Sequence, residues 1–283
     1  MMDLAVSIAH RLRNHAAENQ QDFNAVLTRF ASERLLFRLS QSEHAKSFLL
    51  KGALLFLLWH DLPERPTRDI DLLGFGEEDV ESIESIFREV CAIDASDAVV
   101  FEPASVRGAT IRKQAGYGGV RITLLGKLKN VRLHVQVDVG FGDAVTPAAS
   151  EEVFPVVLAD LPAPILRVYP KYTVCAEKLE AISALGMANT RLKDFYDMWL
   201  LLTPRDMDDD MLGSAIAATF NRRKRPIGDE WPVGLTDEFA ADSQRQRQWQ
   251  AFLAKNGLVA PPLSDVLATL RHCLSVPLDK ARK

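Results

Sequence analysis

The alternating stretch Val131–Val139 ("VRLHVQVDV") is the feature that most constrains how this chain folds. Every second residue in it is aliphatic, and the residues between are Arg132, His134, Gln136 and Asp138. Successive side chains of a β-strand point to opposite faces, so this pattern predicts a strand with one core face and one polar face. The chain must therefore contain a sheet whose polar face carries Asp138.

The pattern before this strand predicts alternating strands and helices. A long amphipathic helix is expected at residues 22–39. It is followed by a strand at 48–51, a glycine turn and buried helix at 52–62, a strand at 67–75 and a helix at 77–92. "ATIRKQ" and "GVRITLLG" then read as paired strands, and beyond the proline-bearing residues 153–170 the pattern turns helical. We expect an α+β protein with two domains, residues 1–165 and 166–283.

Composition excludes several classes. The 283 residues are 47% hydrophobic and 25% charged, as in an ordinary globular protein. Three widely separated cysteines do not suggest a disulfide framework, a thiol nucleophile or a zinc site, and no segment approaches the apolar length of a membrane span. We expect a cytoplasmic protein.

The formal net charge of -4 gives no overall attraction to nucleic acid, so such a partner would need a local basic patch. The candidate patch is "NRRKR", with Arg222, Arg223, Lys224 and Arg225. A solvated helix end is the alternative interpretation of this segment.

Asp69 and Asp71 are the residues that indicate chemistry. Two residues apart on a strand, they emerge on the same face about 7 Å apart and repel each other. A divalent cation such as Mg²⁺ removes that repulsion, and Asp138 from another strand can complete its oxygen ligands. The turn at Gly52 supplies backbone N–H groups suited to phosphate oxygens. A solvated or turn-capping pair is the alternative.

These segments together resemble the AbiEii/AbiGii group of nucleotidyltransferases, toxins of bacterial abortive-infection and toxin–antitoxin systems. "FLLKGALLF" with "RPTRDIDLLGFG" resembles the signature K-G-[GAS]…R-x-[ST]-x-D-[IL]-D, and "VQVDVGFGD" resembles the strand of the third acid. "VCAEKLEAI" and "NTRLKDFYDMWLL" resemble the later motifs, so the similarity covers roughly residues 20–205.

The resemblance implies a polymerase-β-like core, a helical second domain, NTP as co-substrate and Mg²⁺ as cofactor. It assigns the metal to Asp69, Asp71 and Asp138, with Asp138 as metal bridge or general base. It gives further catalytic roles to Lys178 and Asp194, with Lys178 at the nucleotide phosphates. The remaining motif positions are Lys51, Gly52, Ala53 and Arg65, expected near the nucleotide, and Asp197. One departure is that Ala53 replaces the serine of many nucleotidyltransferases, which leaves the backbone donors but no hydroxyl.

The implied activity is transfer of NMP from an NTP to an acceptor hydroxyl, with the tRNA 3′ end as acceptor and a block of translation as the result. A cognate antitoxin is the implied partner. The alternatives are nucleotidylation of a protein or of a small molecule such as an aminoglycoside, or a catalytically silent nucleotide-binding module. Lys178 and Asp194 also have a plain interpretation as ordinary helix-surface and ion-pair residues.

Overall fold

The computed structural model describes residues 4–59, 67, 69–112 and 118–283, which form two compact units. The first unit holds residues 1–142 and 150–168, and the second holds residues 143–149 and 169–283. The domain boundary proposed from the sequence, between residues 165 and 166, falls inside the last strand of the first unit.

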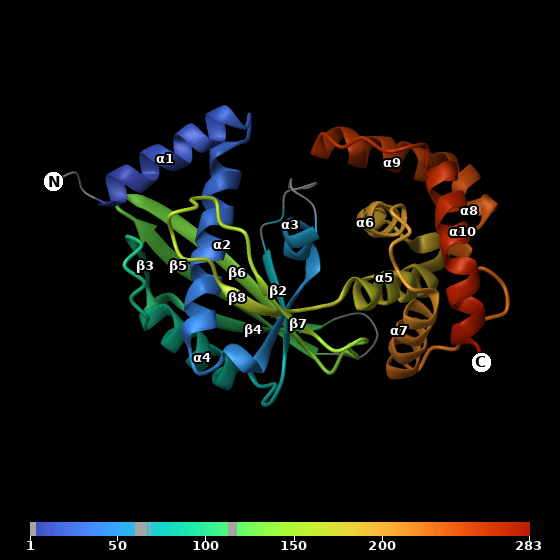
Figure 1. Ribbon diagram of the computed structural model, residues 1–283, viewed down its shortest axis with the longest axis horizontal. Helices are drawn as coiled ribbons and strands as arrows, with labels where there is room; N and C mark the ends of the chain where they lie inside the picture. Colours follow the sequence, from blue (N-terminus) through green and yellow to red (C-terminus); the bar gives the residue numbers. More distant parts are fainter. Residues whose placement is uncertain (1–3, 60–66, 68, 113–117) are drawn as a thin grey trace. The chain divides into compact units, whose positions relative to one another are not determined.

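The first unit combines helices with a mixed sheet (Figure 1). Its helices are α1 (Leu4–Glu18), α2 (Phe23–Gln41), α3 (Phe56–Trp59) and α4 (Val80–Ala92). Its strands are β1 (Phe48–Lys51), β2 (Asp69–Gly74), β3 (Val99–Phe101), β4 (Arg107–Arg112), β5 (Gly118–Leu128), β6 (Val131–Phe141), β7 (Ser150–Val153) and β8 (Ile165–Val168). The predicted α+β class is confirmed.

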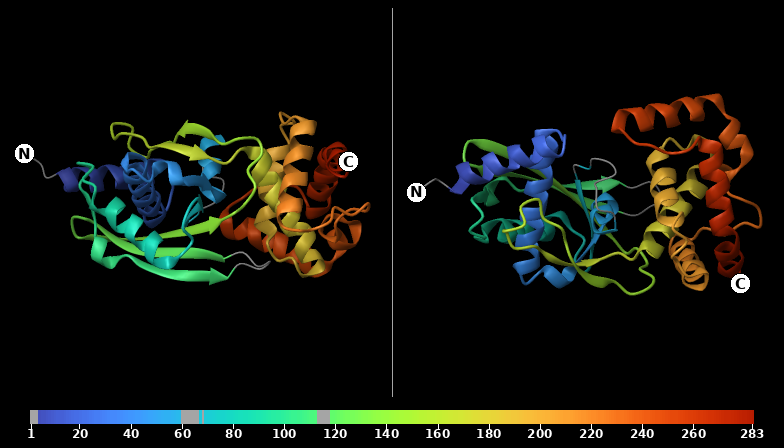
Figure 2. Two further views of the ribbon diagram at one scale, coloured as in Figure 1. Left: turned by 90° about the horizontal axis from the view of Figure 1, so that it is seen from below. Right: turned by 45° about the horizontal axis from the view of Figure 1, so that its top comes forward.

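The eight strands form one sheet in the order β3-β5-β6-β2-β1-β8-β7, and β4 also pairs with β5. β2 runs parallel to β6 and antiparallel to β1, so it lies between the two segments that carry the other predicted site residues. Figure 2 (left) shows the β7–β8 hairpin on one side of α2 and the β5–β6 ribbon on the other. The sheet therefore curls around a helix, and α2 contacts both β6 and β8.

Helix α2 begins where predicted, with Asp22 as its N-cap, but its inner surface is not simply apolar. Glu33, Arg34 and Arg38 are buried beside apolar residues such as Phe30. The Arg38 guanidinium donates two hydrogen bonds of 2.9 Å to the carboxylate of buried Asp97. A polar residue on an amphipathic pattern is normally assigned to solvent, so this buried ion pair is not visible in the periodicity.

Strands β7 and β8 were not predicted. Both are short, and they flank the proline-bearing loop that suggested irregular structure. They pair antiparallel with each other, and β8 joins the sheet by a single parallel contact between Leu50 and Val168. Such short pairings leave too few residues for a period-of-two pattern to be recognised.

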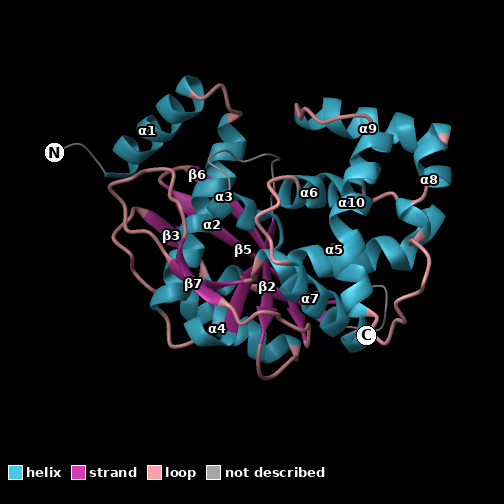
Figure 3. Cartoon of the chain, turned by 45° about the vertical axis from the view of Figure 1, so that its right-hand side comes forward, coloured by secondary structure: helices cyan, strands magenta, loops and turns pink. Residues whose placement is uncertain are grey.

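The second unit, all of whose residues the structure describes, is built of helices (Figure 3). They are α5 (Lys171–Leu185), α6 (Leu192–Leu202), α7 (Asp209–Arg222), α8 (Asp237–Ala241), α9 (Ser243–Asn256) and α10 (Leu263–Ala281). Aromatic side chains fill its core: the Phe195 and Phe239 rings stack at 5.3 Å, and buried Trp249 donates a hydrogen bond to the carbonyl of Pro261. Among the described residues, none of the helices has both the length and the hydropathy that a membrane crossing requires.

Candidate functional site

Strands β2 and β6 bring the three predicted carboxylates onto one face of the sheet. Asp69 and Asp71 alternate with buried Ile70 and Leu72, so both point away from the core and are half-buried. In the parallel register Asp71 lies directly beside Asp138. Neighbouring strands are about 4.8 Å apart, so side chains in register lie next to one another. The structure thus gathers all three acids, while their role as metal ligands stays a prediction.

Arg121, on β5, is a site residue that the sequence reasoning missed. It lies in register with Asp138, and its Nε and Nη2 donate to the two oxygens of Asp138 at 2.8 and 2.7 Å. The hydrogen bond to Asp138 raises the pKa of Arg121, and the charges of Asp69 and Asp71 act in the same direction. Arg121 therefore lies in the field of all three carboxylates and holds one of them.

The glycine turn lies against the same carboxylates. β1 ends at Lys51, which is in register with Asp71, and Gly52 follows with a φ of +75°. A Cβ at position 52 would lie 2.7 Å from the Cγ of Asp71, closer than atoms can approach. Glycine is thus required both by the left-handed backbone and by contact with the carboxylate. The turn opens the short 3-10 helix Gly52–Leu55, which includes Ala53.

Lys51 and Arg65 are the two other residues predicted to contact the nucleotide. Lys51 is only 8% exposed and shares the face of Asp71, so the structure brings it to the site. Arg65 lies outside the described residues.

In the second unit, Lys178 lies in a buried ion-pair cluster. Its Nζ is 3.1 Å from Oδ1 of Asp194 and 2.6 Å from Oδ2 of Asp197, and both carboxylates are almost fully buried. The Arg191 guanidinium contacts the other oxygen of Asp194 at 2.6 Å. Burial alone would raise the pKa of Asp194, but Lys178 and Arg191 outweigh it and lower that pKa to about 2. The contact of Lys178 with nucleotide phosphates stays a prediction.

The basic segment 221–225 splits into an inward and an outward pair. Arg223 and Arg225 contact the two carboxylate oxygens of buried Glu180 at 2.6 and 2.7 Å. Burial lowers the pKa of Arg223, but Glu177 and Glu180 raise it further, so its net shift is upward. Arg222 and Lys224 are exposed. RNA contact stays a prediction for all four, and the exposed pair presents the positive charge.

The carboxylate set fits a hard divalent cation by its chemistry, because it offers oxygen ligands from neighbouring strands. In the described part of the chain, only Glu43, His44 and Glu89 form a group of three with ligand atoms all within 4.8 Å of one another. There the His44 ring lies 2.8 Å from Glu89 at the surface. The Asp69 set is more open, since Asp138 is turned to Arg121. Mg²⁺ binding at Asp69, Asp71 and Asp138 would require Asp138 to change partner.

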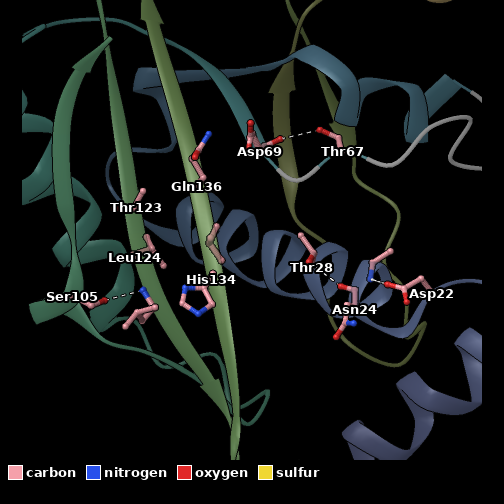
Figure 4. Close-up of a pocket in the computed structure, with 13 residues that line it drawn as sticks. Asp22, Asn24, Thr28, Thr67, Asp69, Ser105, Thr123, Leu124, His134 and Gln136 are labelled. Carbon is pink, nitrogen blue, oxygen red and sulfur yellow. Dashed lines mark hydrogen bonds between the residues drawn. The ribbon is translucent and has the colours of Figure 1, made fainter. Parts of the chain in front are cut away.

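A cavity of about 750 Å³ adjoins Asp69, and both polar and apolar side chains line it (Figure 4). Asp69, Gln136 and His134 line it from the sheet, and Asn24 and Thr28 line it from α2. His134, on the polar face of β6, therefore lines this cavity. No sequence pattern indicates this space, because it depends on how α2 packs beside the start of β2.

Carboxylates on adjacent strands, with a glycine turn against one of them, are typical of proteins that bind nucleotide phosphates through a divalent cation. The chain belongs to the AbiEii family: the family model described as nucleotidyl transferase AbiEii toxin of type IV toxin–antitoxin systems matches residues 34–272. The recognition made from the motifs is thereby confirmed.

Solved structures give a looser likeness. The chain aligns with JHP933 from Helicobacter pylori at 12% identity and a TM-score of 0.46, over 88% of this chain and 90% of that one. A second H. pylori structure, provisionally described as a nucleotidyltransferase, aligns at 12% identity and 0.46, over 88% and 92% of the two chains. A search of curated proteins finds no match.

Proposed function

We propose that the protein transfers a nucleoside monophosphate from an NTP to an acceptor hydroxyl, with the tRNA 3′ end as the acceptor. The observation that carries the proposal is the meeting of Asp71, Asp138 and the Gly52 turn on one face of the sheet. Membership of the AbiEii family supports the class of reaction. The acceptor rests on the resemblance described above.

In the proposed reaction the acceptor oxygen forms a bond to the α-phosphorus, and the bond from that phosphorus to the bridging oxygen of the β-phosphate breaks. Pyrophosphate leaves, and the acceptor proton passes to a carboxylate of the site or to solvent. Mg²⁺, when bound, would supply positive charge for the phosphates and for the attacking oxygen. Asp69, Asp71 and Asp138 are the residues that would hold it.

The chain's own groups have assignable tasks. Backbone N–H groups of the Gly52 turn would hold phosphate oxygens, as such turns commonly do. Buried Lys51 would place a positive charge on the same face. Arg121 would release Asp138 and offer its guanidinium to the phosphates, since a planar guanidinium suits two oxygens at once.

A direct test uses α-labelled NTPs, Mg²⁺ and total tRNA with the wild type, Asp69→Asn, and the control Glu151→Gln. Glu151 lies on the edge strand β7 and is exposed, so the control removes a carboxylate charge without touching the site. We expect label in tRNA from the wild type and from Glu151→Gln, and none from Asp69→Asn. Equal labelling by Asp69→Asn would contradict the proposal.

A silent nucleotide-binding module is the second candidate, and one observation favours it. Arg121 engages both oxygens of Asp138, which would block this carboxylate as long as the pair persists. Calorimetric titration with NTPs, followed by a turnover assay, separates the two candidates: NTP binding without pyrophosphate release would support the silent module. Transfer to a protein or to an aminoglycoside would appear as label in those acceptors when they replace tRNA.

The family's toxin role supports a further part of the proposal, that the protein arrests growth and has a cognate antitoxin. Induction in a bacterial host should stop growth, and Asp71→Asn at the same protein level should relieve the arrest. Continued arrest by Asp71→Asn would separate toxicity from the carboxylate site.

A further inference from the structure

Arg121 covers the carboxylate of Asp138 on the site face. Its Nε and Nη2 donate to the two oxygens of Asp138 at 2.8 and 2.7 Å; the side chain of Asp138 is 14% exposed, and that of Arg121 is 41% exposed. We propose that Arg121 couples the two ligands of the site: it contributes to binding of the NTP phosphates only when the carboxylates hold a divalent cation and Asp138 no longer holds Arg121. This inference rests on the proposed transferase function and specifies how its two ligands depend on each other.

The hydrogen bonds of this pair keep Arg121 away from other anions. A guanidinium recognises a carboxylate and a phosphate in the same way, through two parallel N–H groups that meet two oxygens. Two donors of Arg121 already meet Asp138, and among the described residues its side chain makes no other hydrogen bond. Before a cation is bound, Arg121 is therefore an internal counterion of Asp138, and the phosphates of an NTP have to compete with that carboxylate for it.

The strand register sets four charged residues in one row across the sheet. Lys51 of β1 is in register with Asp71 of β2. Asp71 is in register with Asp138 of β6, which in turn is in register with Arg121 of β5. Adjacent strands are about 4.8 Å apart, so the row spans roughly 14 Å, with the two carboxylates in the middle and a cation at each end. Arg121 therefore lies one strand away from the carboxylates that would hold the metal and the phosphates.

All three carboxylates of the set attract Arg121. The pKa of Arg121 is raised first by its hydrogen bond with Asp138, and the charges of Asp138, Asp69 and Asp71 act in the same direction. A divalent cation held by the same carboxylates offsets these charges, because it brings positive charge to the groups that retain the guanidinium. Metal binding and retention of Arg121 thus compete for the same negative charge.

The residues next to Arg121 on this face are small or uncharged. Ala109 of β4 is in register with Arg121, and Gly119 and Thr123 precede and follow it on the same face of β5. None of these three carries a charge that would retain the guanidinium once Asp138 has a new partner. Because 41% of its side chain is exposed, Arg121 can turn toward a phosphate without opening the core.

The proposed coupling has a signature that simple attraction between charges lacks. If Arg121 only attracted the nucleotide, its removal would weaken nucleotide binding with or without a metal. In the proposed coupling, its removal weakens nucleotide binding only when the metal is present, and it strengthens binding of the metal alone. Couplings between two ligands of one protein are typically about 5- to 150-fold, which sets the size of the expected effects.

The experiment measures the two ligands separately on the full chain. Electron paramagnetic resonance of Mn²⁺ gives the affinity for the metal alone, and calorimetry gives the affinity for α,β-methylene-ATP, either in saturating Mg²⁺ or in EDTA. The variants are Arg121→Gln and Arg121→Lys, because lysine keeps the charge but cannot bind two oxygens at once. Arg132→Gln is the control: Arg132 is exposed on the same face of β6, six residues and about 20 Å from Asp138.

We expect Arg121→Gln to bind Mn²⁺ at least about fivefold more tightly than the wild type, with Arg121→Lys between the two. In saturating Mg²⁺, Arg121→Gln should bind α,β-methylene-ATP at least about fivefold more weakly than the wild type, whereas in EDTA the two affinities should be equal. Arg132→Gln should match the wild type throughout. Unchanged Mn²⁺ affinity in the folded Arg121 variants would overturn the inference. So would an equal loss of nucleotide affinity in Mg²⁺ and in EDTA, or the absence of Mn²⁺ binding in every protein.

The two proposals fail separately. If Arg121→Gln changes metal and nucleotide binding as expected but no NTP transfers label to tRNA, the transferase proposal fails and the coupling stands. If the wild type labels tRNA while Arg121→Gln leaves both affinities unchanged, the coupling fails and the transferase proposal stands.

Discussion

The carboxylate face of the first unit and the Lys178 cluster of the second unit use the same kinds of residue in opposite ways. In the Lys178 cluster, two cations, Lys178 and Arg191, meet the two buried carboxylates Asp194 and Asp197 at hydrogen-bonding distance. On the sheet face, three half-buried carboxylates share the surface with Arg121 and Lys51. The first arrangement is balanced among its own groups, whereas the second carries one more carboxylate than cations among these residues.

The two arrangements therefore differ in whether an added ligand stabilises them. A buried cluster with balanced charge holds helices together, and removal of one member leaves an uncompensated charge. An open carboxylate set on neighbouring strands gains from an added cation. Both sets of residues fall on motifs of the family. The contacts of Lys178 and Asp194 indicate that these two residues stabilise the fold, in addition to any role toward the nucleotide.

The largest effect is expected from breaking the balanced cluster. Lys178→Met leaves Asp194 and Asp197 buried without their ammonium, and we expect a loss of about 3–5 kcal/mol in the free energy of unfolding. Lys171→Met is the matched control on the same helix, because Lys171 pairs with exposed Asp206 at 3.2 Å. Surface pairs of this kind are worth about 0–1 kcal/mol. Denaturant titration measures both.

A stable Lys178→Met protein would contradict the balanced-cluster interpretation. If that protein also showed a raised KM for NTP with an unchanged midpoint of unfolding, Lys178 would act at the phosphates as the family resemblance implies.

The second prediction concerns the carboxylate face of the first unit, where carboxylates outnumber cations. Asp71→Asn removes a charge from the carboxylate set while keeping its shape, and we expect transfer to fall by about 10²–10³-fold, the usual cost of one electrostatic group in an active site. Because three carboxylates outnumber Arg121 and Lys51 on this face, the stability should stay the same or rise slightly. Initial rates of label transfer and thermal unfolding measure the two quantities, with Glu151→Gln as the control.

A stability loss as large as that of Lys178→Met would show that Asp71 belongs to a balanced structural network, and the contrast between the two regions would disappear.

A third test concerns Glu33, a buried carboxylate that lacks sufficient partners. Its Oε2 accepts from the N–H of Val157 at 2.8 Å, but its Oε1 has no hydrogen-bond partner among the residues that the structure describes. Burial raises the pKa of Glu33 to about 7, against a lowering by the Val157 hydrogen bond and nearby arginines. The folded state thus binds the proton more tightly than the unfolded state. The resulting stability is present below the unfolded pKa, about 4.3, and is lost as pH rises through 7.

In the wild type, the free energy of unfolding should therefore fall by on the order of 3 kcal/mol between about pH 4.5 and pH 7. In Glu33→Gln this fall should be absent. Asp194 has the opposite sign, because its pKa is lowered to about 2 and its contribution is lost only as pH falls toward that value. Denaturant titrations across pH 4–8 separate the two. An unchanged pH profile in Glu33→Gln would show that Glu33 remains ionised throughout.

The sequence was sufficient for the parts of the site that follow from strand periodicity. Asp69, Asp71 and Asp138 could be assigned to polar strand faces, and Gly52 to a turn, before any register was known. Arg121 could not be found, because its importance depends on the antiparallel register that puts it beside Asp138.

Two further failures have physical reasons. Glu33 and Arg38 are charged residues, which an amphipathic pattern normally assigns to solvent, yet the sheet curls around α2 and buries them. The cavity wall at His134 arises because, within the described residues, β2 pairs with β6 only from Gln136 onward, and only the tertiary structure determines the register of two strands.

The smallest effect is expected at the basic segment 221–225, at the end of α7, where two arginines have carboxylate partners and two basic residues are exposed. Glu180, Glu177 and Asp143 offset the charges of Arg223 and Arg225, so RNA phosphates should be contacted through exposed Arg222 and Lys224. Replacing both with serine should weaken tRNA binding modestly and reduce the slope of log affinity against log salt by about 1–2. The control removes the same charge at exposed Lys255 and Lys283. Filter binding across salt concentrations measures the slope, and an equal change in both double variants would indicate general electrostatic attraction rather than contact at this segment.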